Sequence, residues 1–269
     1  MNSRQLVAHL NKLAPPRYAE SWDNTGVSFG NLDREISKIM IALEPSEVVI
    51  NQAVECGADV LITHHPMIFK PVGSLSYDSL IGRKITKLAQ NNIVTFSMHT
   101  NMDIAVMSHK SADILGLVDT RILEVTGTEI IGGKEENIGF GSIGRVEECI
   151  SLLECVQLVK EKFNIDNLRV IGDMNKSVES IAILPGSGKS FINNVIKEGV
   201  DVLVTGDIDY HSASDARDLG VHIIDAGHFE TEYFFVEYME SYLKELLEKV
   251  GCEEISIQIA VEESPFTVV

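Results

Sequence analysis

The stretch "DVLITHHPMIF", residues 59–69, joins a short apolar run to two adjacent histidines. An apolar run of this length, bounded by turn-forming residues, is typical of a strand buried in the core. The run ends at Thr63, and His64, His65 and Pro66 follow it directly. Side chains that can bind a ligand therefore stand at the point where a strand leaves the core.

Strands and helices alternate on both sides of this stretch. The sequence predicts strands over 36–43 and 93–100, and helices over 45–57 and 80–92. With the strand at 59–63, this gives a βαβαβ order, which favours a mostly parallel sheet covered by helices.

The second half of the chain repeats the same order. Strands are predicted over 178–184, 201–207 and 221–228, with helices over 189–199 and 212–220 between them. We therefore expect two similar, interlinked α/β lobes.

Two matches in the same order support an internal duplication. "GADVLIT" (57–63) and "GVDVLVT" (199–205) agree at five of seven positions. "HTNMD" (99–103) and "HFETE" (228–232) each place a carboxylate four residues after a histidine. A sequence pattern that is common where a helix leads into a strand would explain one match, but a second match in the same order favours duplication. The first half carries extra residues after His65, which we expect to form a lid.

A stretch rich in glycine and charge, "VTGTEIIGGKEENIG" (125–139), is the expected boundary between the lobes. The predicted division is therefore a first lobe over 1–124 and a second over 125–269. For the long helix expected after residue 228, packing back on the first lobe is the alternative.

Composition indicates a globular protein in a reducing compartment. The chain has 269 residues, 45% of them hydrophobic, and a mean hydropathy of +0.10. No apolar run is long enough to cross a bilayer. The first 16 residues predict an amphipathic helix that ends at two prolines, not a signal peptide. The four cysteines form no CxxC pair, so we expect neither a thiolate metal site nor disulfides, and a cytoplasmic location.

The net charge of −18 weighs against nucleic acid and membrane partners. A surface this acidic repels phosphate backbones and anionic lipids. A small anionic substrate would need a local positive charge, which a bound cation can supply.

Imidazoles and carboxylates gather at the predicted strand ends in both halves of the chain, where open α/β sheets bind ligands. They are His64, His65, His99, Asp103, His228 and Glu232. His228 and Glu232 would share one face of a helix, one turn apart. Each residue alone has a simpler interpretation as a hydrogen-bonding or helix-terminal side chain. Their convergence predicts a metal site.

The histidine doublet favours two ions over one. Neighbouring side chains on a strand point to opposite faces, and Pro66 biases His65 towards an extended backbone. Two ions a few ångströms apart could each take one histidine, with a carboxylate such as Glu232 between them. Mixed imidazole and carboxylate ligands suit Zn, Mn, Fe, Co or Ni.

"LPGSGKS" (184–190) suggests a nucleotide-binding loop, but Ile183 stands where that motif needs its first glycine. Backbone amides at the start of the following helix could still hold a phosphate or carboxylate, helped by Lys189.

Several of these motifs together resemble the NGG-interacting-factor-three-like proteins, widely labelled GTP cyclohydrolase 1 type 2 homologues. The resemblance spans residue 3 to the C-terminus, and the pair "THHP" and "GHxxTE" is its most specific part. The motifs are "SWDNTGVSFG" (21–30), "LITHHPMIFKPV" (61–72), "HTNMD" (99–103), "GDIDYHSASDARDLG" (206–220) and "DAGHFETE" (225–232). The chain resembles the short form, which lacks an extra domain between the lobes.

The resemblance implies two α/β lobes with a dinuclear metal centre between them and a ring-shaped homohexamer. It implies that His65 and Asp103 hold one ion, that His64 and His228 hold the other, and that Glu232 bridges them. His99 would then orient a ligand or the substrate.

Metal-dependent hydrolysis is the first functional expectation, on a nucleotide or another small phosphorylated or C–N substrate. The GTP cyclohydrolase reaction enters through the resemblance alone. His211 is a candidate acid or base, and His99 a second catalytic candidate. The alternative is a protein that binds or delivers metal, or serves as a scaffold, without catalysing a reaction.

Overall fold

The stretch quoted first forms β3 (Val60–Thr63), the middle strand of a five-stranded sheet in the computed structural model, which describes residues 1–268. The order of the sheet is β1-β4-β3-β2-β11, and its last four strands run parallel. The other strands are β1 (Gly26–Phe29), β2 (Lys38–Ala42), β4 (Val94–Ser97) and β11 (Ser256–Ile259). The parallel sheet predicted for the first half is therefore present.

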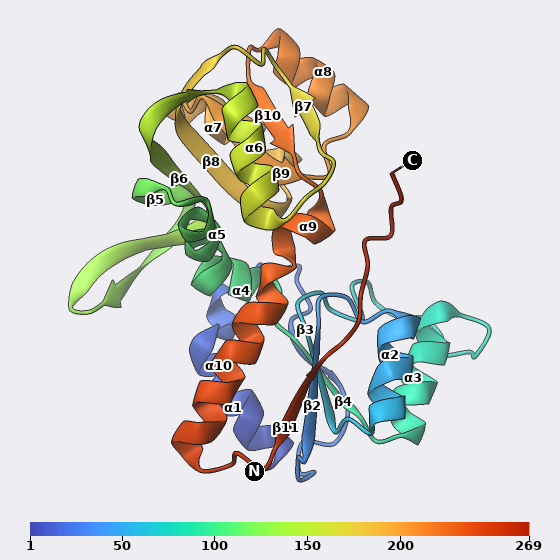
Figure 1. Ribbon diagram of the computed structural model, residues 1–269. Helices are drawn as coiled ribbons and strands as arrows, with labels where there is room; N and C mark the ends of the chain where they lie inside the picture. Colours follow the sequence, from blue (N-terminus) through green and yellow to red (C-terminus); the bar gives the residue numbers. More distant parts are fainter. Residues whose placement is uncertain (269) are drawn as a thin grey trace. The chain divides into compact units, whose positions relative to one another are not determined.

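Helices cover both faces of this sheet. They are α1 (Ser3–Leu13), α2 (Glu47–Cys56), α3 (Leu80–Gln90) and α10 (Phe234–Val250). Figure 1 shows α2 and α3 on one face and α1 and α10 on the other. Because helices exclude water from both faces, every residue of β3 is buried, which explains its uninterrupted apolar run.

A second sheet has six strands in the order β5-β6-β8-β9-β10-β7. They are β5 (Val118–Ile131), β6 (Lys134–Ser151), β7 (Arg169–Ile171), β8 (Ser177–Ser187), β9 (Val202–Gly206) and β10 (His222–Asp225). Only β8, β9 and β10 run parallel to one another, and the remaining pairs are antiparallel. The expectation of a mostly parallel sheet is therefore wrong here.

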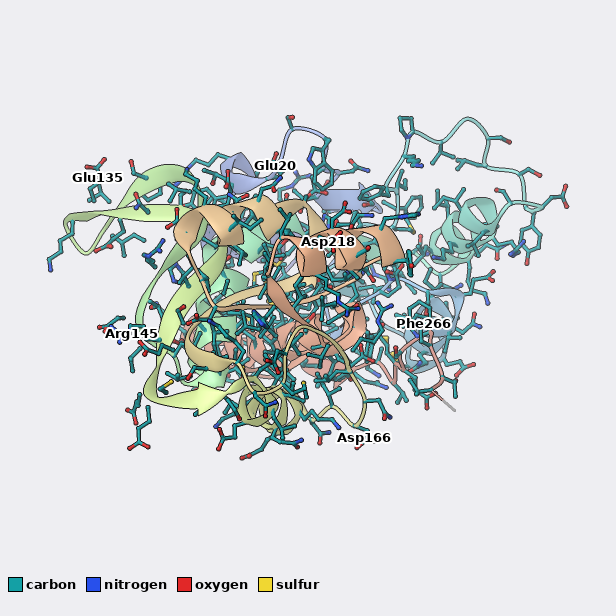
Figure 2. The ribbon with its side chains drawn as sticks, turned by 90° about the horizontal axis from the view of Figure 1, so that it is seen from above. Glu20, Glu135, Arg145, Asp166, Asp218 and Phe266 are labelled. Atoms are coloured by element: carbon teal, nitrogen blue, oxygen red, sulfur yellow. The ribbon has the colours of Figure 1, made fainter. Side chains whose placement is uncertain are left out.

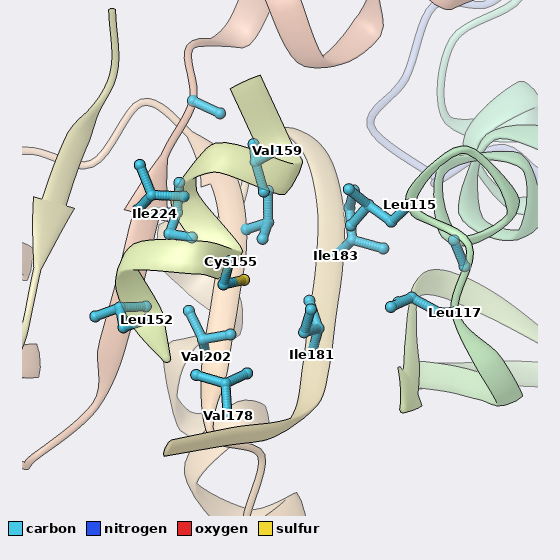
Figure 3. Packing of buried hydrophobic residues seen from close by; sticks show 14 of the residues in the cluster. Leu115, Leu117, Leu152, Cys155, Val159, Val178, Ile181, Ile183, Val202 and Ile224 are labelled. Atoms are coloured by element: carbon cyan, nitrogen blue, oxygen red, sulfur yellow. The ribbon is translucent and has the colours of Figure 1, made fainter. Parts of the chain in front are cut away.

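The helices that pack on the second sheet are α5 (Ser108–Leu115), α6 (Leu152–Phe163), α7 (Ile192–Glu198) and α8 (Tyr210–Asp218). Alternate residues of each central strand face different helices. Ile181 on β8 and Val202 on β9 pack with Cys155 of α6, as Figure 3 shows. Ala182 and Leu203, one position along each strand, pack instead with α7 and α8. Burial of each of these isoleucine, valine and leucine side chains stabilises the fold by roughly 1.5–3 kcal/mol.

The internal repeat is visible in matched local contacts. Gly57 ends α2 and Gly199 ends α7, both in the left-handed conformation with φ of 71° and 65°. Two residues later, Asp59 accepts backbone hydrogen bonds from the start of β2, and Asp201 does the same at the start of β8. "GxD" thus has the same structural role in both halves: the glycine ends a helix and the aspartate joins neighbouring strands.

The glycine-rich stretch at 125–139, where we expected the boundary between the lobes, forms a hairpin. It lies within β5 and β6, which are joined at Gly132 and Gly133, both with positive φ. The structure divides into a first unit of residues 1–102 and 233–263 and a second unit of residues 103–232 with the C-terminal residues from 264. Residues 103–124, which the sequence grouped with the first lobe, contribute α5 and part of β5 to the second unit.

The long helix expected from residue 228 is interrupted at Tyr233. It forms a short α9 (His228–Glu232) and then α10, which packs on β2 and β11. The division between the units falls at this interruption, so α10 belongs to the first unit.

The acidic character of the chain lies on its surface. Exposed acidic side chains such as Glu135, Asp166 and Asp218 are labelled in Figure 2. Among residues 1–268, none of the helices combines the length and the apolar character that a bilayer crossing requires.

Candidate metal centre

His64 follows β3 directly and is buried. Its Nδ1 lies 2.7 Å from the carbonyl oxygen of Met98, which follows β4. Because a carbonyl oxygen only accepts hydrogen bonds, Nδ1 carries a proton, so Nε2 holds the lone pair in the neutral ring. The buried histidine is thus held in the tautomer that a metal ligand requires.

His65 is held by a carboxylate from the neighbouring strand. Its Nδ1 lies 2.9 Å from Oε2 of Glu44, which stands just beyond the end of β2. The backbone N–H groups of Leu43 and Glu44 donate to the carboxylate of Glu262, at 2.6 and 3.0 Å. Burial raises the pKa of Glu262 despite these two hydrogen bonds. This region of the first unit therefore fixes both the ring of His65 and the chain that carries Glu44.

His99 has the most enclosed carboxylate partner. Its Nδ1 lies 2.9 Å from Asp23, whose side chain is 0% exposed. The backbone N–H and the hydroxyl of Thr100 also donate to Asp23, at 3.1 and 2.6 Å. Burial alone would raise the pKa of Asp23, but the hydrogen bonds from His99 and Thr100 outweigh it and lower that pKa. Asp23 is therefore an ionised anchor for the His99 ring.

These three histidines form one cluster in the first unit. One candidate ligand atom from each lies within 4.8 Å of the others. The ring centroids of His64 and His65 are 5.0 Å apart, because β3 ends at Thr63 and strand alternation no longer separates the rings. With metal–nitrogen bonds of about 2.0–2.1 Å, such spacing suits ligands of one ion or of two neighbouring ions.

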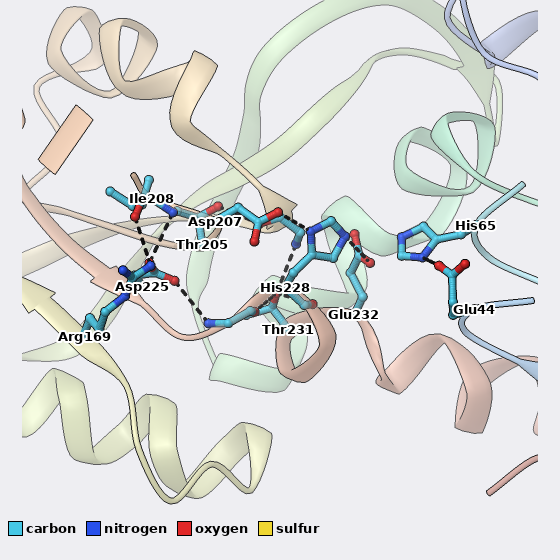
Figure 4. A network of polar contacts seen from close by, with 12 residues as sticks. Glu44, His65, Arg169, Thr205, Asp207, Ile208, Asp225, His228, Thr231 and Glu232 are labelled. Atoms are coloured by element: carbon cyan, nitrogen blue, oxygen red, sulfur yellow. Dashed lines mark hydrogen bonds and ion pairs between the residues drawn. The ribbon is translucent and has the colours of Figure 1, made fainter. Parts of the chain in front are cut away.

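The second unit holds its own donor pair in α9. Nε2 of His228 lies 3.0 Å from Oε2 of Glu232, one turn along the helix. Nδ1 of His228 lies 2.7 Å from Oδ2 of Asp207, which follows β9, as Figure 4 shows. With Nδ1 engaged by Asp207, Nε2 is the ring nitrogen of His228 on the side of Glu232.

A glycine in the 184–190 stretch packs against this pair. A Cβ atom on Gly186 would lie 2.1 Å from Oε1 of Glu232 and 3.4 Å from Nε2 of His228. The backbone of Gly186 is held on both sides, since its N–H donates to Thr231 and its carbonyl accepts from the Thr205 hydroxyl. The backbone of "LPGSGKS" at Gly186 thus packs directly against His228 and Glu232, a role that its sequence did not reveal.

Asp103 and His211 are the remaining predicted residues, and both lie in the second unit. Asp103 is the first residue of a π-helical turn (Asp103–Met107) in the second unit. His211 lies exposed in the first turn of α8, with its ring against that of Tyr210 at 5.5 Å between centroids. The ligand role of Asp103 and the catalytic role of His211 stay predictions.

Two anchoring carboxylates were missed by sequence reasoning. Glu44 and Asp207 each orient a histidine through Nδ1, and they lie two residues and one residue beyond the ends of the parallel strands β2 and β9. The signal was present, because an acidic residue at a strand end is in the same position as the histidines themselves. Imidazoles with oxygen partners at Nδ1, together with carboxylates, form a donor set that suits a divalent transition-metal ion.

Comparison with known proteins gives one consistent family. Residues 1–265 match Duf34/NIF3 (NGG1p interacting factor 3). Two curated relatives are each named "GTP cyclohydrolase 1 type 2 homolog". The one from Clostridium acetobutylicum is 36% identical over 92% of this chain and 91% of its own length. The one from Clostridium perfringens is 34% identical over 92% and 93%.

A solved structure shows the same fold. The Bacillus cereus protein related to NIF3 superposes with a TM-score of 0.91 at 24% identity, over 100% of this chain and 99% of that protein. At this identity the likeness extends to the fold alone.

Proposed function

Since this chain belongs to the Duf34/NIF3 (NGG1p interacting factor 3) family, we propose that it binds two divalent transition-metal ions and uses them to hydrolyse a small substrate. His65 and Asp103 would hold one ion, His64 and His228 the other, and Glu232 would bridge them. The name of the curated relatives makes a nucleotide the first substrate to try.

The state of the imidazoles supports this proposal most strongly. His64, His65 and His228 each have Nδ1 within 2.9 Å of an oxygen acceptor. A histidine that is merely packed in a core has no need for its metal-binding nitrogen to be defined in this way. Repetition of the arrangement in both units favours a common purpose, and metal binding is the chemistry that requires it.

When bound, the ions would supply Lewis-acid activation of water and of the scissile bond. The protein would provide orientation and proton transfer. His99 is the first proposed acid or base, and the hydrogen bond between its Nδ1 and Asp23 fixes the orientation of its ring. His211 is the second proposed acid or base, at the start of α8 in the other unit.

Elemental analysis combined with a turnover assay tests the proposal. We expect close to two equivalents of transition metal per chain, and hydrolysis of at least one compound in a panel of nucleotides and phosphoesters. His65→Ala should lower both the metal content and the turnover. His109→Ala, at an exposed histidine in α5, is the matched control and should change neither.

Different outcomes separate the alternatives. Full metal content without turnover above that of His65→Ala would remove the hydrolase assignment. Rapid transfer of the metal to an acceptor chelator would then favour a delivery protein. Metal content that is the same in His65→Ala and the unaltered protein would contradict the site itself.

We also propose the homohexameric ring that the family resemblance implies. Light scattering during size-exclusion chromatography measures the assembly mass directly, and a monomeric mass near 29.6 kDa would contradict it.

A further inference from the structure

Two large aromatic side chains are exposed beside the histidine cluster of the first unit. Trp22 is 57% exposed and Phe69 is 55% exposed, and their ring centroids lie 5.8 Å apart. Trp22 is also the single tryptophan of the chain. Rings of this size on the surface of an acidic protein lose the stabilisation that burial would give them, so an exposed pair indicates a contact with something else.

The backbone that carries both rings is fixed. The side chain of Asp23, next to Trp22, is buried and accepts three hydrogen bonds from His99 and Thr100. The side-chain amide of Asn24 donates to the carbonyl of Ile68 at 2.7 Å, which ties the segment of Trp22 to that of Phe69. The rings are therefore positioned before any ligand arrives, which lowers the entropic cost of binding.

Both rings also contact His99. The centroid of its imidazole lies 6.0 Å from that of Trp22 and 6.4 Å from that of Phe69, both in edge-to-face geometry. His99 belongs to the cluster whose candidate ligand atoms lie within 4.8 Å of one another. A molecule lying on the aromatic pair would therefore be in reach of the histidines.

We infer that Trp22 and Phe69, whose ring planes are inclined by 58°, form an aromatic platform beside the histidine cluster. The planar heteroaromatic ring of a small-molecule ligand would stack on the face of one ring and contact the other ring at its edge. Two rings offer too little apolar area for a stable protein partner, which needs an interface of roughly 1,200–2,000 Å². They offer the right area for one flat ring, and stacking on an aromatic face accepts any base-like ring. This inference deepens the proposed function by naming the substrate class, but binding to the platform does not require hydrolysis.

Fluorescence of Trp22 provides a direct test, because no other tryptophan contributes to the signal. Guanosine 5′-triphosphate, guanosine and inorganic triphosphate are titrated into the full-length protein, with and without added Zn²⁺, with correction for absorbance. We expect saturable quenching by the two compounds that carry a ring, and none by inorganic triphosphate.

Two substitutions give the test its control. Phe69→Ala keeps the fluorophore and should weaken binding of guanosine about tenfold, from the loss of one stacked ring. Leu75→Ala removes a side chain that is also 55% exposed in the same segment, and it should leave the affinity unchanged. Both sites are on the surface, and thermal unfolding confirms that each variant is folded.

The results separate this inference from the proposed hydrolase. Quenching by guanosine without any hydrolysis would support the platform and leave the hydrolase unsupported. Hydrolysis of simple phosphoesters, with no response of Trp22 to either ring-bearing probe, would overturn the platform alone. Equal affinities of Phe69→Ala and Leu75→Ala would also overturn it.

Discussion

Gly186→Ala separates the metal-binding role of the 184–190 stretch from its role in folding. Gly186 has a φ of +70°, so alanine there costs about 1–2 kcal/mol of backbone strain. The new Cβ would also lie 2.1 Å from Oε1 of Glu232. Hydrogen bonds to Thr231 and Thr205 hold the backbone, so the carboxylate must move by roughly 1 Å or more to reach an ordinary contact.

This displacement should be cheap for folding and costly for metal binding. Glu232 Oε1 is the end of a flexible side chain, and it can turn away without disturbing the core. A shift of about 1 Å in a ligand, or in a group that orients one, should lower metal affinity about 10–100-fold, or roughly 1.4–2.8 kcal/mol.

Gly199→Ala is the matched control. Gly199 has a φ of +65°, and a Cβ there would meet nothing within 4 Å. It therefore introduces the same backbone strain without the steric displacement. Urea denaturation of the metal-free proteins should give similar losses of stability for the two variants. Competition with a chromophoric chelator should show weakened Zn²⁺ binding for Gly186→Ala only.

Equal Zn²⁺ affinity in Gly186→Ala, Gly199→Ala and the unaltered protein would refute the reasoning. It would mean that Glu232 does not contribute to a metal site, or that its carboxylate can be displaced without effect. A much larger loss of stability in Gly186→Ala would show instead that the 184–190 stretch is needed mainly for folding.

Three further predictions concern other anchoring and buried groups. Asp207→Asn keeps an acceptor oxygen near Nδ1 of His228 but removes the negative charge, and it should lower Zn²⁺ affinity about tenfold in chelator competition. The control Asp215→Asn, on the exposed surface of α8, should leave the Zn²⁺ affinity unchanged. Burial alone would raise the pKa of Asp59, but the hydrogen bonds that its carboxylate accepts lower this pKa below the unfolded value of about 3.9. The ionised carboxylate therefore stabilises the fold above that pH, and this stabilisation is lost as the pH falls. Urea midpoints should therefore decline less steeply below about pH 4 in Asp59→Asn than in the unaltered protein, and parallel declines would contradict this. Burial raises the pKa of Cys155 to about 12, so iodoacetamide at pH 8 should label the exposed Cys149 and not Cys155, as read by peptide mass spectrometry.

The sequence alone determined β2, β3 and β4, the three central strands of the first sheet, and the residues that stand at their ends, but not the edge strands β1 and β11. Apolar runs and helix periodicity are local signals, because burial on two faces imposes them on any sequence that forms a covered strand. The matched "GxD" motif of the two halves was likewise readable, since a helix end needs glycine and a strand start needs an acceptor for its N–H groups. The histidine doublet followed from the same local pattern.

Only the tertiary structure decided how those histidines are held. Glu44, Asp23 and Asp207 lie 21 to 76 residues from the rings that they orient, and no local pattern links such distant partners. The hairpin at 125–139 was not predicted, because its strands are largely exposed and so lack an apolar run. Gly186 and the pair of Trp22 and Phe69 depend on close approach between separate segments. Local sequence fixes which face of an element is apolar, whereas packing fixes which distant groups meet.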